Sequence, residues 1–125
     1  MEHNMVGWFE IPVTDMDRAK LFYNKVFNIE IQVQDLAGTL MGWFPFDEGE
    51  TGASGSLMQQ SAYIPSHDKG VLIYFSSEDV NTELNRVEAS GGTIVQAKTQ
   101  ISPDVGFMAV FLDSEGNRIA LHSRL

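Results

Sequence analysis

The chain has 125 residues, of which 43% are hydrophobic, and this content is enough for one compact domain with a single core. It contains no cysteine, which excludes disulfides and thiolate sites, and no apolar run long enough to cross a bilayer. With 17 acidic and 8 basic residues the net charge is -9, which disfavours nucleic acid and membrane partners and favours a small-molecule ligand. The N-terminus has no signal-peptide pattern, so we expect a cytoplasmic protein.

The first half of the chain predicts a strand, a helix and three further strands. Residues 7–13 alternate, so one face carries Phe9, Ile11 and Val13 and the other carries Trp8, Glu10 and Pro12. The capping residues 14–17 then begin a helix with an apolar face of Ala19, Phe22, Tyr23 and Val26. Strands are expected at 29–34, 39–46 and 55–60. The polar, glycine-rich stretch 47–54 predicts a loop, either an ordinary hairpin connection or a lid over a cavity.

The second half repeats this order of elements. A strand at 71–76 is followed by a helix at about 79–89, which Gly91 and Gly92 end, and by strands at 93–100, 106–112 and 118–123. Residues 113–117 form the turn between the last two strands. The repeat predicts a single domain over 1–125, with module one at about 5–61, a crossing at about 62–69 and module two at about 70–125.

Three stretches, 11–23, 87–92 and 113–121, resemble the vicinal oxygen chelate superfamily, the group of glyoxalase, bleomycin-resistance and extradiol dioxygenase proteins. This resemblance implies an α+β fold of two βαβββ modules in tandem. The first and last strands of these modules meet around a shared cavity in a curved sheet. It also implies a homodimer and, in metal-dependent members, a divalent cation held by His and Glu side chains.

The metal-ligand positions that the resemblance implies carry poor donors in this chain. They fall on Trp8, near Leu72, on Ser56 or Leu57, and on Ala120. Divalent ions need several carboxylate or imidazole donors that converge on one point. We therefore expect no cofactor and no residue that ligates a metal, with a displaced divalent ion as the less favoured variant.

Strand alternation predicts which side chains face the implied cavity. Three predicted strands each turn one face toward the cavity. These faces carry Trp8 and Glu10 on the strand at 7–13, Leu72 and Tyr74 on the strand at 71–76, and Arg118, Ala120 and His122 on the strand at 118–123. Such aromatic walls with few polar groups are typical of small-molecule sites. The predicted ligand-binding residues are Trp8, Leu72, Tyr74, Arg118, Ala120 and Trp43. Trp8 and Tyr74 could equally be filling the space of a lost metal site, and for Trp43 core packing is favoured over pocket lining or a dimer contact.

Glu10 and His122 are the candidate catalytic residues, because they are the one pair of titratable groups that the repeat places on strands expected to meet in the centre, where a carboxylate and an imidazole could transfer protons. A structural role for both, with Glu10 beside Arg118 or solvent and His122 in a hydrogen bond at the rim, is the alternative. The sequence thus favours a glyoxalase-like, metal-independent small-molecule-binding protein. A lyase or isomerase of glyoxalase-like type that uses Glu10 and His122, or an auxiliary module without chemistry, remains open.

Overall fold

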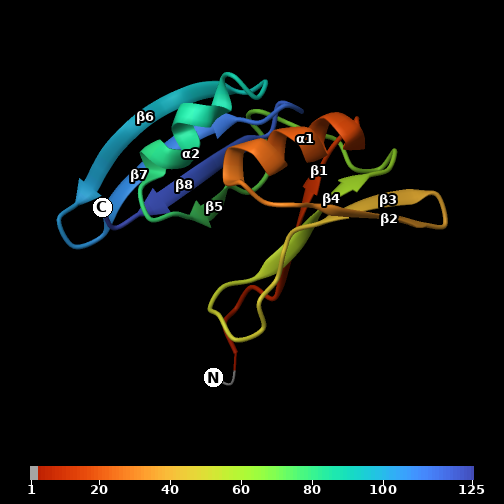
Figure 1. The fold of residues 1–125 in the computed structure, drawn as a ribbon, viewed down its shortest axis with the longest axis horizontal. Helices are drawn as coiled ribbons and strands as arrows, with labels where there is room; N and C mark the ends of the chain where they lie inside the picture. The colour runs from red at the N-terminus through yellow and green to blue at the C-terminus, as the bar shows by residue number, and fades with distance from the viewer. Residues whose placement is uncertain (1–2) are drawn as a thin grey trace.

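The computed structural model describes residues 3–125, which form two four-stranded β-sheets and two α-helices (Figure 1). The first unit consists of β1 (Trp8–Pro12), α1 (Met16–Phe27), β2 (Gln32–Leu36), β3 (Thr39–Trp43) and β4 (Ser54–Gln59). The second consists of β5 (Ile73–Ser76), α2 (Val80–Val87), β6 (Thr93–Ser102), β7 (Gly106–Leu112) and β8 (Arg118–Ser123). This order confirms the predicted α+β fold of two βαβββ modules in tandem.

Each sheet contains the strands of one module. The strand orders are β1-β4-β3-β2 and β5-β8-β7-β6. In both sheets the first strand of the module runs parallel to its last strand, whereas the other neighbours are antiparallel. Strands β1 and β5 are therefore edge strands of their respective sheets, and the space between these two edges becomes the place where the modules can form a joint site.

Alternation along β1 separates a core face from an exposed face, as predicted. Ile11 is 2% exposed, whereas Trp8 is 39% exposed. The parallel register places Glu10 beside Ser56 and Ile11 beside Leu57. Side chains of paired residues point to the same face of a sheet. Ser56 therefore shares the face of Trp8, and Leu57 belongs to the core, which decides the register that the sequence left open.

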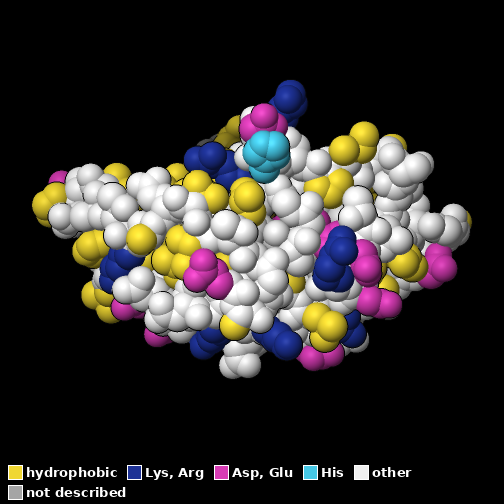
Figure 2. Space-filling view, turned by 90° about the horizontal axis from the view of Figure 1, so that it is seen from above, with side chains coloured by type: hydrophobic (Ala, Val, Ile, Leu, Met, Phe, Trp, Pro, Cys, Tyr) yellow, Lys and Arg dark blue, Asp and Glu magenta, His cyan; other side chains and the backbone are white. Residues whose placement is uncertain are grey.

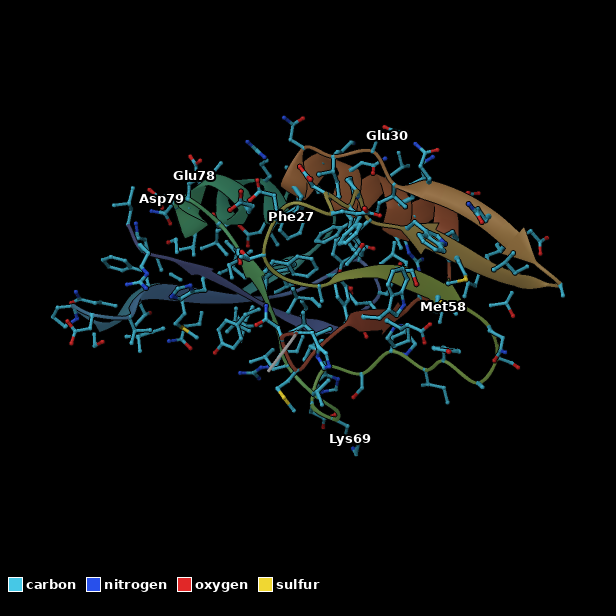
Figure 3. All side chains as sticks on the ribbon, turned by 90° about the horizontal axis from the view of Figure 1, so that it is seen from below. Phe27, Glu30, Met58, Lys69, Glu78 and Asp79 are labelled. Atoms are coloured by element: carbon cyan, nitrogen blue, oxygen red, sulfur yellow. The ribbon has the colours of Figure 1, made fainter. Side chains whose placement is uncertain are left out.

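The two modules share one hydrophobic core. Both helices lie on the same side of the sheets, and the connection that carries Lys69 lies on the opposite side (Figures 1 and 3). One cluster combines Phe22 and Tyr23 of α1 with Leu84 of α2 and Phe111 of β7. Neither helix in residues 3–125 combines the length and the apolar composition that a membrane span requires.

Residues 113–117, here called the clasp turn, join the end of module two to module one. The Glu115 Oε1 atom accepts hydrogen bonds from the backbone nitrogens of Thr14 and Asp15, both at 2.9 Å, and Oε2 accepts one from Arg18 Nε at 2.7 Å. Burial alone would raise the pKa of Glu115, but these donors outweigh it and lower the pKa to about 2. A carboxylate from module two thus anchors the N-terminus of α1, where the helix dipole also favours negative charge.

Asp113 provides the buried half of the same clasp. Its Oδ2 accepts a hydrogen bond from the Tyr23 hydroxyl at 2.6 Å, and its Oδ1 accepts from the Asn117 backbone nitrogen at 2.8 Å. The Asn117 side chain in turn donates to the Pro12 carbonyl at 2.7 Å. Burial raises the pKa of Asp113 in spite of these donors, and burial together with the neighbouring Asp113 charge raises the pKa of Tyr23.

Several predicted element boundaries were wrong. The second strand begins at Gln32 instead of residue 29, because Asn28 ends α1 in the left-handed conformation with φ of 55°. The backbone nitrogens of Ile29 and Ile31 are then bonded to the carbonyl and side-chain oxygens of Asn24, so they are not available to a strand ladder. The first strand of module two begins at Ile73 instead of residue 71, and the second helix ends at Val87.

Candidate ligand-binding site

Two adjoining cavities lie along the junction between the edges of β1 and β5. They share Glu10 and residues 71–73 as lining, so together they form one continuous groove. The larger part has a volume of about 820 Å³ and is lined by β1, β5 and residues 51–54; we call it the aromatic chamber. The smaller part, of about 540 Å³, lies between residues 64–70 and the start of β8; we call it the charged chamber.

Phenylalanine rings form the helix side of the aromatic chamber. Phe9 of β1 meets Phe75 of β5 edge-to-face, with centroids 5.7 Å apart, and this contact bridges the two sheets. Phe27 of α1 packs on Phe75 at 4.7 Å, and Phe44 packs on Phe9 at 5.5 Å. Figure 3 shows Phe27 directed from α1 toward the strands. These rings fill the space between β1 and β5 on the core side of the chamber.

Exposed aromatic rings lie on the opposite face of the same two strands. Trp8 is 39% exposed and Tyr74 is 50% exposed, and both line the aromatic chamber. Trp43 of β3 meets the Trp8 ring edge-to-face at a centroid distance of 5.0 Å and does not itself line either cavity. The expectation that Trp43 fills the core was wrong, because it is 38% exposed on the face that β3 shares with Trp8. Its packing instead restricts the orientation of the Trp8 ring.

Glu10 is the one acidic or basic side chain among the residues lining the aromatic chamber. Its Oε1 accepts a hydrogen bond from the Tyr63 hydroxyl at 2.7 Å, and this bond raises the pKa of Tyr63. Among residues 3–125, no lysine, arginine or histidine forms an ion pair with Glu10. The carboxylate is thus held in place by a neutral donor, and its charge is left for solvent or a ligand.

Ser54 contributes a polar atom with no partner. The side chain lines the aromatic chamber at the end of β4 that pairs with Trp8, and the residue is 7% exposed. Its hydroxyl oxygen is buried and makes no hydrogen bond within the described part of the chain. Buried hydroxyls are normally paired. The Ser54 hydroxyl is therefore available to hydrogen-bond a ligand in the chamber.

The charged chamber contains groups of both signs. Arg118, Lys69, His67 and Asp68 line it together with Glu10. Asp68 forms an ion pair with Lys69 at 3.7 Å, and its carboxylate lies 3.9 Å from His67 Nε2, a contact that becomes an ion pair when the imidazole is protonated. Both pairs lie on the crossing between the modules, at the outer end of which Figure 3 shows Lys69. Since these pairs are exposed, they are weakly coupled and screened by salt.

The structure distributes the predicted site residues unevenly. Trp8, Leu72, Tyr74 and Glu10 all line the aromatic chamber, whereas Arg118 lines the charged one. Ala120 is fully buried beside Tyr74 and lines neither. His122 likewise lines neither cavity; its Nε2 lies 2.7 Å from the Val105 carbonyl oxygen. Glu10 and His122 are thus hydrogen-bonded to other residues, to Tyr63 and Val105 respectively. A proton-transfer pair of Glu10 and His122 stays a prediction.

Sequence reasoning missed the phenylalanine side of the chamber, the Tyr63 contact and the buried hydroxyl of Ser54. Alternation assigns Phe9 and Phe75 to the core, and both do pack there. Their rings also border the chamber because it opens at the edge of each sheet, where both faces of a strand are accessible. Tyr63 lies on the crossing, for which no periodicity exists to predict a direction.

The residues at the implied metal positions do not fit a divalent ion. Trp8, Leu72 and Ala120 have no ligating group, and Ser56 offers only a hydroxyl, which lies 3.3 Å from the Met58 sulfur. Within residues 3–125, no group of three or more His, Cys, Asp or Glu side chains is arranged to hold a metal. We therefore derive no step through a metal at this site.

Comparison with known proteins identifies the family. The model of the Glyoxalase/Bleomycin resistance protein/Dioxygenase superfamily matches residues 5–121. The chain belongs to this superfamily. The resemblance predicted from the sequence is thereby confirmed, and superfamily membership accounts for the tandem modules whose first strands border the groove.

Individual relatives are distant in sequence and similar in fold. A glyoxylase-like domain-containing protein from Didymella fabae is 25% identical over 98% of this chain and 95% of its own length. An antibiotic binding protein from Streptomyces sp. CB03234 superimposes with a TM-score of 0.72 at 22% identity, covering 98% of both chains. Glyoxalase I from Zea mays gives a TM-score of 0.68 at 15% identity over 94% of this chain. The chain spans 45% of that maize protein.

Proposed function

We propose that this superfamily member is a metal-independent small-molecule-binding protein that holds its ligand in the aromatic chamber. The observation that carries the proposal is the chamber itself, about 820 Å³ between β1 and β5. Pockets for small ligands usually measure about 300–1,000 Å³ and combine aromatic walls with a few polar groups. Here Trp8 and Tyr74 supply the walls, and Glu10 and Ser54 supply the polar groups.

Two further findings support binding over chemistry. The positions where metal-dependent relatives are expected to place donors carry Trp8, Leu72 and Ala120, which favours contact with an apolar ligand. One relative of the same size and fold is an antibiotic binding protein. Ligand sequestration is therefore the activity that we expect of this chain.

The test is a ligand titration of the wild type and two variants. We expect compounds from an aromatic library to raise the thermal midpoint of the wild type, because a ligand that binds the native state stabilises it by mass action. Trp8→Ala should weaken such binding at least tenfold. Leu21→Ala is the matched control, since Leu21 is 59% exposed on α1 and lines neither cavity. No stabilisation by any compound, or equal loss in both variants, would contradict the proposal.

Metal analysis tests the alternative of a glyoxalase-like lyase or isomerase. We expect the purified protein to carry less than a stoichiometric amount of any divalent ion. A stoichiometric ion whose removal by chelation abolishes turnover of a glyoxalase-type substrate would favour the enzyme. In that case Glu10→Gln and His122→Asn should each abolish the turnover, because both side chains would be needed for proton transfer.

We further propose that the protein forms a homodimer. Hydrophobic side chains form several separate groups between charged ones on the face seen in Figure 2. Exposed apolar residues also lie on the two outermost strands, Val33 and Leu36 on β2 and Val95 and Ile101 on β6. Such edges offer surfaces for a second copy. Light scattering that returns only the monomer mass would contradict this proposal.

The cytoplasmic location expected from the sequence stays a prediction.

A further inference from the structure

We infer that the ligand class of the aromatic chamber is organic ammonium cations, in which an apolar body carries a positively charged nitrogen. This inference rests on the proposed binding function and specifies its ligand. Three features of the groove support it: the sign of its charge, the aromatic faces beside that charge, and the location of the basic side chains.

The charge within the chamber is negative and unneutralised. Glu10 is the single acidic or basic residue of its lining, and among residues 3–125 it has no ion-pair partner. The Tyr63 hydroxyl donates to Oε1 at 2.7 Å, so a neutral donor orients the carboxylate. An anionic ligand would be repelled from this end of the groove.

The aromatic rings beside Glu10 favour a cation for a second reason. The face of an aromatic ring carries a negative potential, and rings arranged around a site recognise substituted ammonium groups. Trp8 lies two residues from Glu10 on the same face of β1, and Tyr74 lines the same chamber from β5. The Trp43 and Trp8 rings pack edge-to-face with centroids 5.0 Å apart, a contact that supports the Trp8 ring beside the chamber.

The basic side chains of the groove lie in its other part. Arg118, Lys69 and His67 line the charged chamber and are absent from the lining of the aromatic chamber. Lys69 forms an exposed ion pair with Asp68 at 3.7 Å, and His67 Nε2 lies 3.9 Å from the same carboxylate. Glu10 lines both chambers, so its carboxylate lies where the aromatic chamber meets the charged one. A ligand amine is expected beside Glu10, and a ligand acceptor, if it has one, toward Arg118.

A matched pair of probes isolates the effect of charge. (4-Hydroxyphenyl)trimethylammonium and 4-tert-butylphenol have nearly the same shape and differ by one positive charge. Their dissociation constants would be measured at pH 6.5 and low salt by NMR, through the side-chain indole signals of the two tryptophans. We expect the wild type to bind the cation at least about tenfold more tightly, which is the size of one exposed ion pair plus one cation–π contact.

Variants assign this preference to the groove. Glu10→Gln keeps an acceptor for Tyr63 and should remove most of the preference for the cation. Glu88→Gln makes the same charge change at an exposed position outside both cavities and should keep it. Tyr74→Leu removes a ring without changing charge and should lower the affinity for the cation more than for the neutral probe. Circular dichroism would check that each variant is folded.

The possible outcomes separate this inference from the proposed function. Equal binding of the two probes by the wild type would overturn the cation inference and leave the binding function standing. A preference that survives in Glu10→Gln would overturn the role given to that carboxylate. Binding of neither probe would count against both proposals. A preference that Glu10→Gln abolishes, Glu88→Gln retains and added salt weakens would support the inference.

Discussion

Replacing Glu115 by glutamine should loosen the junction between the modules. The carboxylate accepts hydrogen bonds from the backbone nitrogens of Thr14 and Asp15 and forms an ion pair with Arg18 at 2.7 Å. Glutamine keeps the size of the side chain and one acceptor oxygen, so Glu115→Gln removes the negative charge and replaces the second acceptor oxygen by an NH2 group that cannot accept a hydrogen bond. The N-terminus of α1 would then lose its anionic partner from the clasp turn.

The expected cost follows from the pKa of the carboxylate. The contacts of Glu115 lower this pKa from 4.5 to about 2. At about 1.4 kcal/mol for each pKa unit, this difference corresponds to about 3 kcal/mol. The Arg18 side chain is 53% exposed, so solvent screens part of the interaction. We therefore expect Glu115→Gln to lower the free energy of unfolding at pH 7 by about 2 kcal/mol.

The pH dependence gives the reasoning a definite sign. Because the folded-state pKa lies below the unfolded-state value, the stabilisation is fully present above about pH 5 and declines as the pH falls toward 2. The difference between wild type and Glu115→Gln should thus shrink by more than half between pH 7 and pH 3. Asp113, whose pKa is raised by burial, titrates in both proteins, so its contribution cancels in this difference.

Urea unfolding followed by circular dichroism at pH 7, 5, 4 and 3 measures this difference directly. Glu88→Gln, an exposed carboxylate at the end of α2, is the control for the change in net charge and should stay within about 0.5 kcal/mol of the wild type. A Glu115→Gln cost that is the same at pH 7 and pH 3, or that is below about 0.5 kcal/mol at pH 7, would refute the electrostatic account of the clasp.

Two further predictions concern the hydrogen bond between Tyr23 and Asp113 and the lack of metal donors at the implied ligand positions. Tyr23→Phe removes the hydroxyl that donates to Asp113 at 2.6 Å and should lower the free energy of unfolding, measured in urea, by about 1–3 kcal/mol. The control is Tyr74→Phe, at an exposed ring, which should change this free energy by less than about 0.5 kcal/mol. Similar costs for the two variants would contradict this reasoning. Trp8→His should not create a zinc or nickel site, because Leu72 and Ala120 cannot complete the coordination. Elemental analysis after dialysis measures the metal content. One tightly bound ion per chain would contradict the prediction and show that donors elsewhere in the groove converge.

Local patterns in the sequence predicted the elements and their repetition, and the resemblance to the superfamily implied how the two modules assemble. Period-two alternation assigned Ile11 to the core and Trp8 to the exposed face of β1, because successive side chains of a strand point to opposite sides. Helical spacing identified the buried face of α1, and the repetition of strand, helix and three strands indicated two modules. The vacant donor positions were also readable in advance, since residue identity decides whether a side chain can coordinate a metal.

Only the tertiary structure decided which side chains meet. The groove arises where β1 and β5, far apart in the sequence, become neighbouring sheet edges, and local periodicity carries no information about that approach. Alternation therefore placed Ala120 in the site, although it is buried beside Tyr74, and left out Phe9, whose ring borders the chamber from the core side. The Tyr63 contact with Glu10 likewise depends on how the crossing folds back over the sheets.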